Sequence, residues 1–482
     1  MGRADQSPLL WFLAASLLLA GGCKTLSPDP SPELLVEVPT AFSTPAPDRE
    51  AVSQPPIREW WRLMGSTELD GLIHEGLDQN YDLKVLQAKV LQARAVLEKE
   101  RASLKPGLDF SLGGERSRSR TQTSHSQGGT TQGSHSWDAS LTGDYTVDAW
   151  GKTRAAVNAS ALDLEAAQQD YEDAVLELTA EIAEAWVDII SVRSRREILQ
   201  NQIRLSTTQL ELLKLRFLNG TASALDVSQQ QEALTEVLSL SPLLEKEEAL
   251  LINTLGFLTG RTPGRAVPVN TRKLPAPGSL SGAGIPSDLL ENRSDIRAAR
   301  MRLLSSALEV EAAKADLLPS FTLSARALFS SGQLDLLFHN WVATLGASVA
   351  GPLFDGGLKR AEIQRTRAVV QEQVNLYARA VAKALQEVEN SLVSMDKQAS
   401  YIRQLELELK AARLTVKDAR IQYLNGQSSY LNYLTARSAI DSLERQLISE
   451  RASIIKEEIG FHRVIGWQVP LDRDPGQMTG ED

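Results

Sequence analysis

Two long stretches of the chain, residues 152–218 and 358–424, contain no proline, and their apolar residues recur every three or four positions. This periodicity is typical of an α-helix. Each stretch would form a helix of about 67 residues, or roughly 100 Å at 1.5 Å per residue. Aromatic residues make up only 5% of the chain, and interiors rich in alanine and leucine suit helices that pack closely side by side.

Both long helices run into the same short break, a Leu-Asn-Gly sequence that ends at Gly220 and again at Gly426. Glycine readily adopts the left-handed backbone that a tight turn between two helices needs. We therefore expect helices to return near 225–258 and 431–460. Each would begin with a serine N-cap and a capping-box partner three residues later, namely Ser223 with Asp226 and Ser429 with Asn432.

The sequence contains an internal repeat, so that its two halves match each other. Residues 151–220 match residues 357–426 at a constant offset of 206, and residues 83–106 match residues 296–319 at an offset of 213. The difference in length therefore lies in one polar loop rich in serine and glycine, at 117–136. This pattern predicts a fold with a two-fold internal repeat.

Each repeat contains a predicted hairpin of β-strands, at about 104–150 and about 317–355. Apolar and polar residues alternate along 137–147 and along 321–329, as in strands with one buried face. Strands of about 10 to 14 residues can cross a bilayer when tilted, although a soluble sandwich would show the same alternation. Four strands cannot enclose a water-filled barrel, so a membrane barrel requires several chains.

The first repeat spans 59–260 and carries a helical tip at about 217–226. The second spans 287–467 and carries a tip at about 423–432. The remaining parts are a Pro-rich linker near the middle of the assembly, at 261–286, and a C-terminal tail, at 468–482.

Shorter helices, near 67–104 and 287–317, would lead into the strand hairpins. One leading helix and one returning helix together approach the length of a long helix. The two short helices of each repeat can therefore stack end to end beside the long one and form an even wall.

The N-terminus has the features of an exported protein. An apolar run at 9–20 ends in small residues and predicts a signal peptide over 1–22. Cys23, the single cysteine, follows at once, which indicates acylation, and an ordinary cleavage site with an incidental cysteine is the alternative. "LAGGC" resembles a bacterial lipobox, and Lys24 behind the cysteine suggests passage to the outer membrane. Residues 23–58, rich in Pro, Ser, Thr and Glu, would form a lipidated tether.

The sequence gives no indication that the protein is an enzyme or that it binds nucleic acid. The net charge of −10 and the isoelectric point near 5.3 leave no basic face for phosphates. No phosphate-binding loop or nucleophile motif occurs. The histidines have no metal-ligand spacing; they are His74, His125, His135, His339 and His462. We therefore predict a protein that is not an enzyme, with no metal or other cofactor, whose energy comes from a partner.

The order of the motifs "WWRLMGSTELDGLI", "DAWGKTR" and "PLFDGG", together with the repeat, resembles the TolC-like outer-membrane factors. The similarity is greatest to the OprM- and NodT-type efflux lipoproteins and extends from Cys23 to about Trp467. It implies a mainly α fold with membrane β-strands. Three chains would form a twelve-stranded outer-membrane β-barrel, continuous with a long periplasmic α-helical barrel.

The resemblance implies a passive, gated exit duct of a tripartite efflux system. A homotrimer in the outer membrane of a Gram-negative bacterium, anchored by lipid and extending into the periplasm, would meet a periplasmic adaptor and an inner-membrane transporter of the RND type. A lipid-anchored trimeric coiled-coil stalk or adhesin without a lumen is the alternative. Such a stalk would keep a strict heptad and would not need strand hairpins. The resemblance does not distinguish a duct for drug or metal efflux from a duct for protein secretion.

Site residues follow from the same resemblance. The adaptor would dock on the tips, at Leu218, Asn219, Gly220, Thr221, Leu424, Asn425, Gly426 and Gln427. Asp226, Asn432 and Thr435 are the aperture candidates. Relatives often place aspartates on the second tip, where this chain has Asn432 and Thr435, so Asp226 is the better charged candidate. A threefold ring of carboxylates resists closing unless it is neutralised or hydrogen-bonded; a purely capping role for Asp226 remains an equal alternative.

Overall fold

A computed structural model describes residues 39, 42, 59–121, 130–262, 264, 267–276 and 292–466. The predicted signal peptide, Cys23, most of the tether and the C-terminal tail lie outside the described residues. Part of the linker lies outside them as well. The described residues divide into two compact units. The first contains Val96–Leu162 and Leu303–Val374, and the second contains the remaining helical segments.

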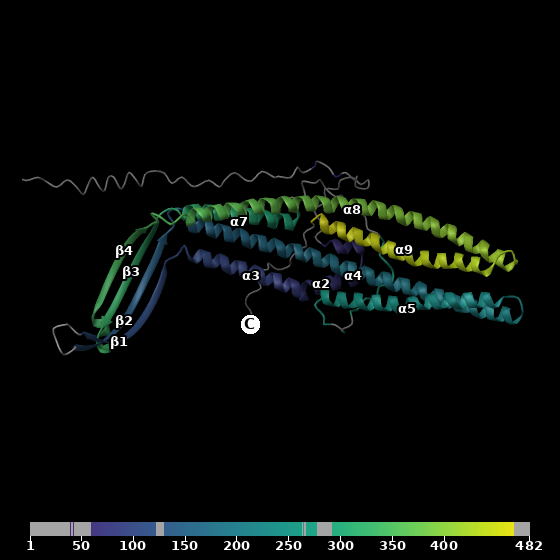
Figure 1. The fold of residues 1–482 in the computed structure, drawn as a ribbon, viewed down its shortest axis with the longest axis horizontal. Helices are drawn as coiled ribbons and strands as arrows, with labels where there is room; N and C mark the ends of the chain where they lie inside the picture. Colours follow the sequence, from purple (N-terminus) through teal and green to yellow (C-terminus); the bar gives the residue numbers. More distant parts are fainter. Residues whose placement is uncertain are drawn as a thin grey trace, which may run out of the picture. The chain divides into compact units, whose positions relative to one another are not determined.

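The first unit holds one antiparallel sheet with the strand order β1-β2-β3-β4 (Figure 1). The strands are β1 (Gly107–Thr121), β2 (Thr130–Val147), β3 (Ser320–Ser331) and β4 (Trp341–Ala350), with the short 3-10 helix η2 (Leu334–His339) between the last two. β1 and β2 contain 15 and 18 residues, more than expected. The prediction of a loop over the whole of 117–136 is wrong, because backbone pairing continues to Thr121 opposite Thr130. Polar side chains support it, as the Ser117 and Ser134 hydroxyls lie 2.7 Å apart.

One face of the sheet is apolar and the other is polar. The strand register places Phe110 opposite Leu141, Leu141 opposite Ala327, and Ala325 opposite Leu345. The next residues along each strand, such as Ser140 and Thr142, point to the other face. Phe110 is 72% exposed and Leu345 is 88% exposed. An apolar sheet face this exposed in a single chain requires a lipid or a partner to cover it.

Two aspartates from the predicted motifs start the long helices α4 (Lys152–Leu218) and α8 (Leu358–Leu424). The carboxylate of Asp148 accepts hydrogen bonds from the backbone N–H groups of Thr153 (3.1 Å) and Arg154 (3.0 Å). Asp355 accepts from Gly357 (2.9 Å) and Lys359 (3.0 Å) in the same way. A carboxylate suits the positive end of a helix dipole, so both motifs act as strand-to-helix caps. Both long helices have the predicted bounds.

The other helices whose bounds lie within the described residues are η1 (Trp60–Met64), α2 (Thr67–Gln79), α3 (Tyr81–Ala102), α5 (Ala224–Leu258), α7 (Ser294–Ala315) and α9 (Tyr430–Val464). None of the described helices is both long and apolar enough to cross a membrane. The prediction of one continuous helix over 67–104 is wrong, because the chain breaks at Asn80, which has an extended backbone.

Asn80 joins the end of α5 to the start of α3. Its side-chain oxygen accepts hydrogen bonds from the N–H groups of Asp82 (2.8 Å) and Leu83 (3.0 Å) and thereby caps α3. Its amide nitrogen donates to the carbonyl of Leu258, the last residue of α5 (3.0 Å). Asn80 is only 3% exposed. One buried amide therefore satisfies polar groups at two helix ends that would otherwise lack partners.

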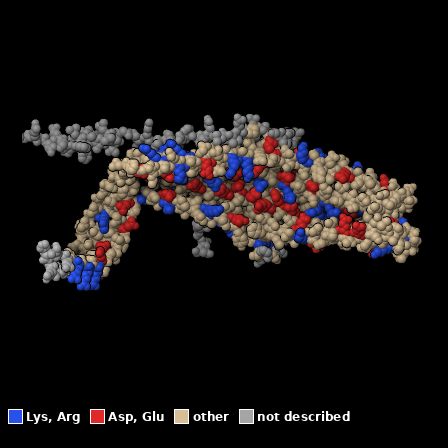
Figure 2. Space-filling view, viewed as in Figure 1, with Lys and Arg blue, Asp and Glu red and all other residues tan. Residues whose placement is uncertain are grey.

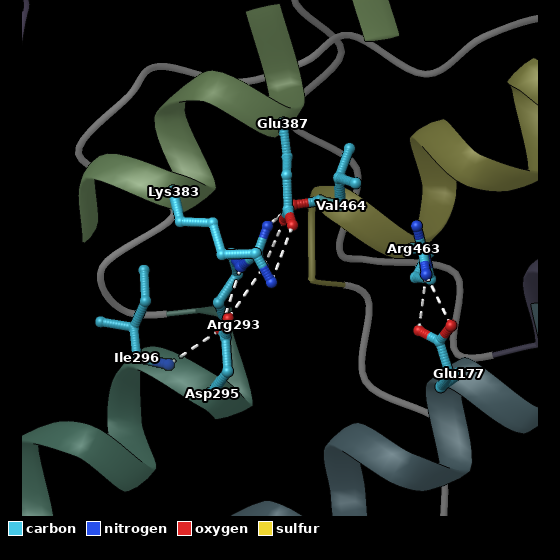
Figure 3. Close-up of polar contacts among 8 residues, drawn as sticks. All are labelled: Glu177, Arg293, Asp295, Ile296, Lys383, Glu387, Arg463 and Val464. Atoms are coloured by element: carbon cyan, nitrogen blue, oxygen red, sulfur yellow. Dashed lines mark hydrogen bonds and ion pairs between the residues drawn. The ribbon is translucent and has the colours of Figure 1, made fainter. Parts of the chain in front are cut away.

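Arg293 joins the corresponding helices of the second repeat, α9 and α7. It lies 213 residues after Asn80, and its partner Val464 lies 206 residues after Leu258. The Arg293 guanidinium donates to the Val464 carbonyl (2.9 Å) and pairs with Asp295 and Glu387, each at 2.8 Å (Figure 3). The predicted end-to-end stacking of leading and returning helices is confirmed at both junctions.

The middle of α4 is covered by η1 and the start of α2. Trp60 and Trp61 are both buried, and the Trp60 indole donates to the Thr179 hydroxyl (3.3 Å). The Trp186 indole donates to Glu68 of α2 (2.8 Å). The indole N–H groups of Trp60 and Trp186 therefore join η1 and α2 to the long helix and are hydrogen-bonded where burial would be costly.

We predict that Arg293→Met lowers the stability of the folded protein by about 3 to 5 kcal/mol, because Asp295 and the Val464 carbonyl lose this partner and Glu387 loses the nearer of its two cations. Arg365→Met is the matched control, since Arg365 pairs with Glu362 at an exposed site and should change little. Thermal unfolding of the detergent-solubilised protein measures both. Equal losses in the two variants would contradict the importance of the junction.

Candidate functional site

The two helical tips make the same turn. In the first, the Gly220 N–H donates to the Phe217 carbonyl (3.0 Å) and the Thr221 N–H donates to the Arg216 carbonyl (2.8 Å). Gly220 has φ of +70° and Gly426 has φ of +69°. This is a Schellman motif, which favours glycine at the left-handed position. Nothing lies within 4 Å of a Cβ built on either glycine, so the predicted need for a left-handed backbone, and not a lack of space, explains both.

The starts of the returning helices differ. At the first tip the Ser223 hydroxyl accepts from the Asp226 N–H, and the Asp226 carboxylate accepts from the Ser223 N–H, both at 3.1 Å. The predicted capping box of α5 is therefore confirmed.

The predicted second capping box is wrong. Ser429 occupies the N-cap position of α9 but makes no side-chain cap bond. The Asn432 amide instead donates to the Ser428 hydroxyl (2.9 Å). An asparagine can donate where an aspartate cannot, and the first tip has Ala222, which offers no acceptor, in place of Ser428.

A cluster of side chains joins the two tips to each other. The Tyr423 hydroxyl donates to the Asp226 carboxylate (3.4 Å). The Arg216 guanidinium lies 5.2 Å from the centre of the Tyr423 ring, and the rings of Tyr423 and Tyr430 are 5.1 Å apart. We call Arg216, Asp226, Tyr423 and Tyr430 the tip-contact cluster. It includes residues of α4, α5, α8 and α9, and so connects both helical hairpins.

The surroundings of Tyr423 in this cluster disfavour ionisation of its phenol. Desolvation and then the Asp226 carboxylate raise the pKa of Tyr423, against the opposing effect of Arg216. Tyr423 therefore remains a hydrogen-bond donor to Asp226 at neutral pH. The Asp226 carboxylate thus accepts from the Tyr423 hydroxyl as well as from the Ser223 backbone N–H.

A second layer lies behind the cluster. Tyr430 is buried, and its hydroxyl bonds with the side-chain oxygen of Gln230. The Gln230 amide in turn donates to the hydroxyl (2.7 Å) and the carbonyl (3.0 Å) of Ser206. Beyond it, the Gln202 amide donates to the carbonyl of Asp441 (2.9 Å). Helices α4, α5 and α9 are thus held together by polar contacts, most of them partly buried, at the tips and further along the helices.

The structure separates the three aperture candidates. Asp226 contacts the opposite tip through Tyr423. The Asn432 amide donates to Ser428 of its own tip, and the Thr435 hydroxyl donates to the Leu431 carbonyl (2.9 Å). Thr435 also lines a groove of about 680 Å³ between the helical hairpins. Of the three, Asp226 alone is brought into the tip-contact cluster.

The docking candidates lie on exposed turns. Leu218 is 78% exposed and Leu424 is 56% exposed. Leu225 and Leu431, which follow each turn at matching positions, are also exposed. The tips therefore present apolar side chains to solvent at two equivalent places, which is typical of a surface that contacts another protein.

Sequence reasoning missed Arg216, Tyr423 and Tyr430. A signal for the tyrosines was present, because they differ from their repeat partners: Tyr423 takes the place of Phe217, and Tyr430 takes the place of Ala224. Such polar differences between matching positions indicate contacts that only one repeat makes.

The long helical hairpins, the two-faced sheet and the repeated turns together define a channel of the bacterial outer membrane. The family model described as "outer membrane efflux protein" matches residues 72–260 and 285–466. The chain belongs to this family of outer-membrane efflux channels, which are not enzymes. The predicted fold class, outer-membrane location and role as an efflux exit channel that extends into the periplasm are confirmed, and the stalk is not favoured.

Individual relatives agree with this assignment. The chain is 30% identical over 467 residues to the pyoverdine export outer membrane protein OpmQ of Pseudomonas aeruginosa, with coverage of 95% of this chain and 96% of the relative. The CmeC outer membrane channel of Campylobacter jejuni superposes with a TM-score of 0.82 at 20% identity, over 89% of this chain and 92% of CmeC. The outer membrane protein VceC of Vibrio cholerae gives a TM-score of 0.76 at 25% identity, over 86% and 100%.

The unequal caps give a direct prediction. Ser223→Ala should cost about 1 kcal/mol of local stability, because a side-chain cap is lost, whereas Ser429→Ala should cost little. Amide hydrogen exchange at the first turns of α5 and α9 measures this: exchange should quicken in the first variant and stay nearly unchanged in the second. Equal acceleration in both would contradict the difference in capping.

Proposed function

We propose that three copies of this chain form the exit duct of a tripartite efflux system, and that their helical tips dock on a periplasmic adaptor that links the duct to an inner-membrane transporter of the RND type. The main observation that supports this proposal is the exposure of leucine side chains on both tips. Leu218 and Leu424 project from identical turns. The amphipathic tip of an adaptor's helical hairpin is an occupant of matching chemistry, since helix pairs bind through apolar side chains at regular spacing.

The sheet supports the trimer. Among the residues that the structure describes, β1 and β4 each pair on one side only, and exposed strand edges are usually paired or covered. Four strands cannot close around water, whereas twelve strands from three copies can. In that barrel the polar faces would line the lumen and the apolar faces would contact lipid. Acylation of Cys23 would add an anchor to the same membrane.

The cargo that we propose is a small molecule. OpmQ is named for export of pyoverdine, and TtgI of Pseudomonas putida is named as part of a toluene efflux pump. These two cargoes differ greatly in polarity. Selection of the cargo therefore belongs to the transporter, and the duct carries what it receives.

We further propose that Asp226 controls the periplasmic aperture. In a trimer, three copies of Asp226 would form a ring of carboxylates, whose repulsion the hydrogen bonds from Ser223 and Tyr423 would reduce. Opening the aperture would move the two tips of each chain apart. That motion would break the Tyr423 contact, so the tip-contact cluster favours the closed state.

Photo-reactive residues introduced at Leu218 and Leu424 should cross-link to a periplasmic adaptor in living cells, as identified by mass spectrometry. Leu407 is the matched control, because it is an exposed leucine of α8 about 25 Å from the tip along the helix. It should give no adaptor product. Leu218→Asp and Leu424→Asp should reduce export while leaving the trimer intact. Adaptor products of equal yield at Leu407 would contradict docking by the tips.

Single-channel recording in planar bilayers tests the aperture. The wild-type trimer should show a small resting conductance that rises in Asp226→Ala, because we expect the loss of the Tyr423 contact between tips to outweigh the loss of the remaining repulsion in the carboxylate ring. Asn432→Ala should change it less, since Asn432 bonds within its own tip. An unchanged conductance in Asp226→Ala would remove Asp226 from the gate, and intact trimers without any conductance would contradict the duct.

A further inference from the structure

One side of β1 changes from apolar to cationic along the strand. Leu108, Phe110 and Leu112 point to the apolar face of the sheet, because alternate residues share a face. Beyond Gly114 the same side carries three arginines, at positions 116, 118 and 120. All three are exposed, and no carboxylate is paired with them among the described residues.

Aromatic side chains mark the level at which this change occurs. The register places Trp137 opposite Gly114, and its ring lies across that glycine, where an added Cβ would come within 2.6 Å of a ring carbon. Trp341 lies opposite Phe329 at the same end of the sheet. Belts of tryptophan and other aromatic residues mark the two interfaces of membrane barrels. The arginines therefore follow directly after a membrane-interface level.

The part of the hairpin that carries the arginines extends past the rest of the sheet. β3 pairs with β2 only as far as Ser331, opposite Trp137, while β1 continues to pair with β2 as far as Thr121. The extra seven residues of β1, Glu115–Thr121, reach roughly 23 Å. Figure 2 shows Lys and Arg atoms gathered at this end of the sheet.

The two sides of this ribbon differ in charge. Arg118 lies opposite Gly133 and Arg120 lies opposite Thr131, so small neighbours leave room around these two guanidinium groups, while Arg116 lies opposite His135. The other side carries Ser117 and Ser119, with Ser134 opposite Ser117. Arginines that served only to protect an edge strand from aggregation could lie on either face of the ribbon. Here all three arginines continue the line of the lipid-facing residues.

We propose that Arg116, Arg118 and Arg120 bind the phosphate groups of lipid headgroups in the outer leaflet of the membrane that surrounds the duct. Guanidinium groups form paired hydrogen bonds with phosphate oxygens, and basic residues beside an anionic surface strengthen membrane binding. The ends of the strands that connect to helices face the periplasm, so the arginines lie on the external side. This inference rests on the membrane orientation in the proposed function.

A variant that moves the charges to the other side of the ribbon tests the proposal without changing composition or net charge. Neighbouring residues are exchanged in three pairs: Arg116→Ser with Ser117→Arg, Arg118→Ser with Ser119→Arg, and Arg120→Thr with Thr121→Arg. Binding of fluorescent diphosphorylated lipid A to the full-length, detergent-solubilised protein is measured for both proteins. Phosphatidylcholine with the same label is the reference lipid.

The wild-type protein should prefer lipid A, and the exchanged variant should bind it at least about tenfold more weakly, since each arginine contributes about fivefold near an anionic surface. Equal affinity of the two proteins for lipid A, or no preference of the wild type over phosphatidylcholine, would overturn the proposal. Planar-bilayer conductance of both proteins separates this result from the duct itself: a conducting wild type that shows no lipid preference refutes the lipid site alone, and a wild type that neither conducts nor binds refutes both.

Discussion

The helical wall of each repeat depends on a junction in which one buried side chain binds the last carbonyl of a returning helix. Asn80 does this for α5, and Arg293 does it for α9. Without such a partner, a helix end buried against another helix would leave polar groups unsatisfied. The two positions match in the repeat but use different chemistry: the amide also caps α3, whereas the guanidinium also holds Asp295 and Glu387.

The repeat supplies two similar tips, and the differences between them create their mutual contact. The first tip provides Arg216 and Asp226, and the second provides Tyr423 and Tyr430. Two identical tips would place like charges or like rings at both positions. The divergence of the copies thus gives each chain a polar contact between its own hairpins, at the end where the proposed adaptor docks.

How far the sequence predicts this protein depends on how local each signal is. The bounds of α4 and α8 follow from periodicity and the lack of proline, both local properties. The break at Asn80 was missed, because an asparagine within a helical pattern gives no clear stop signal, and its partner Leu258 is distant in the chain. The length of β1 was underestimated, since serine and arginine resemble a loop. The prediction of a second capping box was wrong because the Asn432 amide donates a hydrogen bond to Ser428 instead.

The most direct test of the account combines two substitutions and asks whether Asp226 and Tyr423 hold the tips through one shared contact. Open probability in planar bilayers would be recorded for wild type, Asp226→Ala, Tyr423→Phe and the double variant, with trimers verified in each. We predict that Tyr423→Phe raises the open probability of the otherwise wild-type channel and causes no further increase in the Asp226→Ala variant. Independent effects of the two substitutions, or no effect of Tyr423→Phe alone, would contradict it.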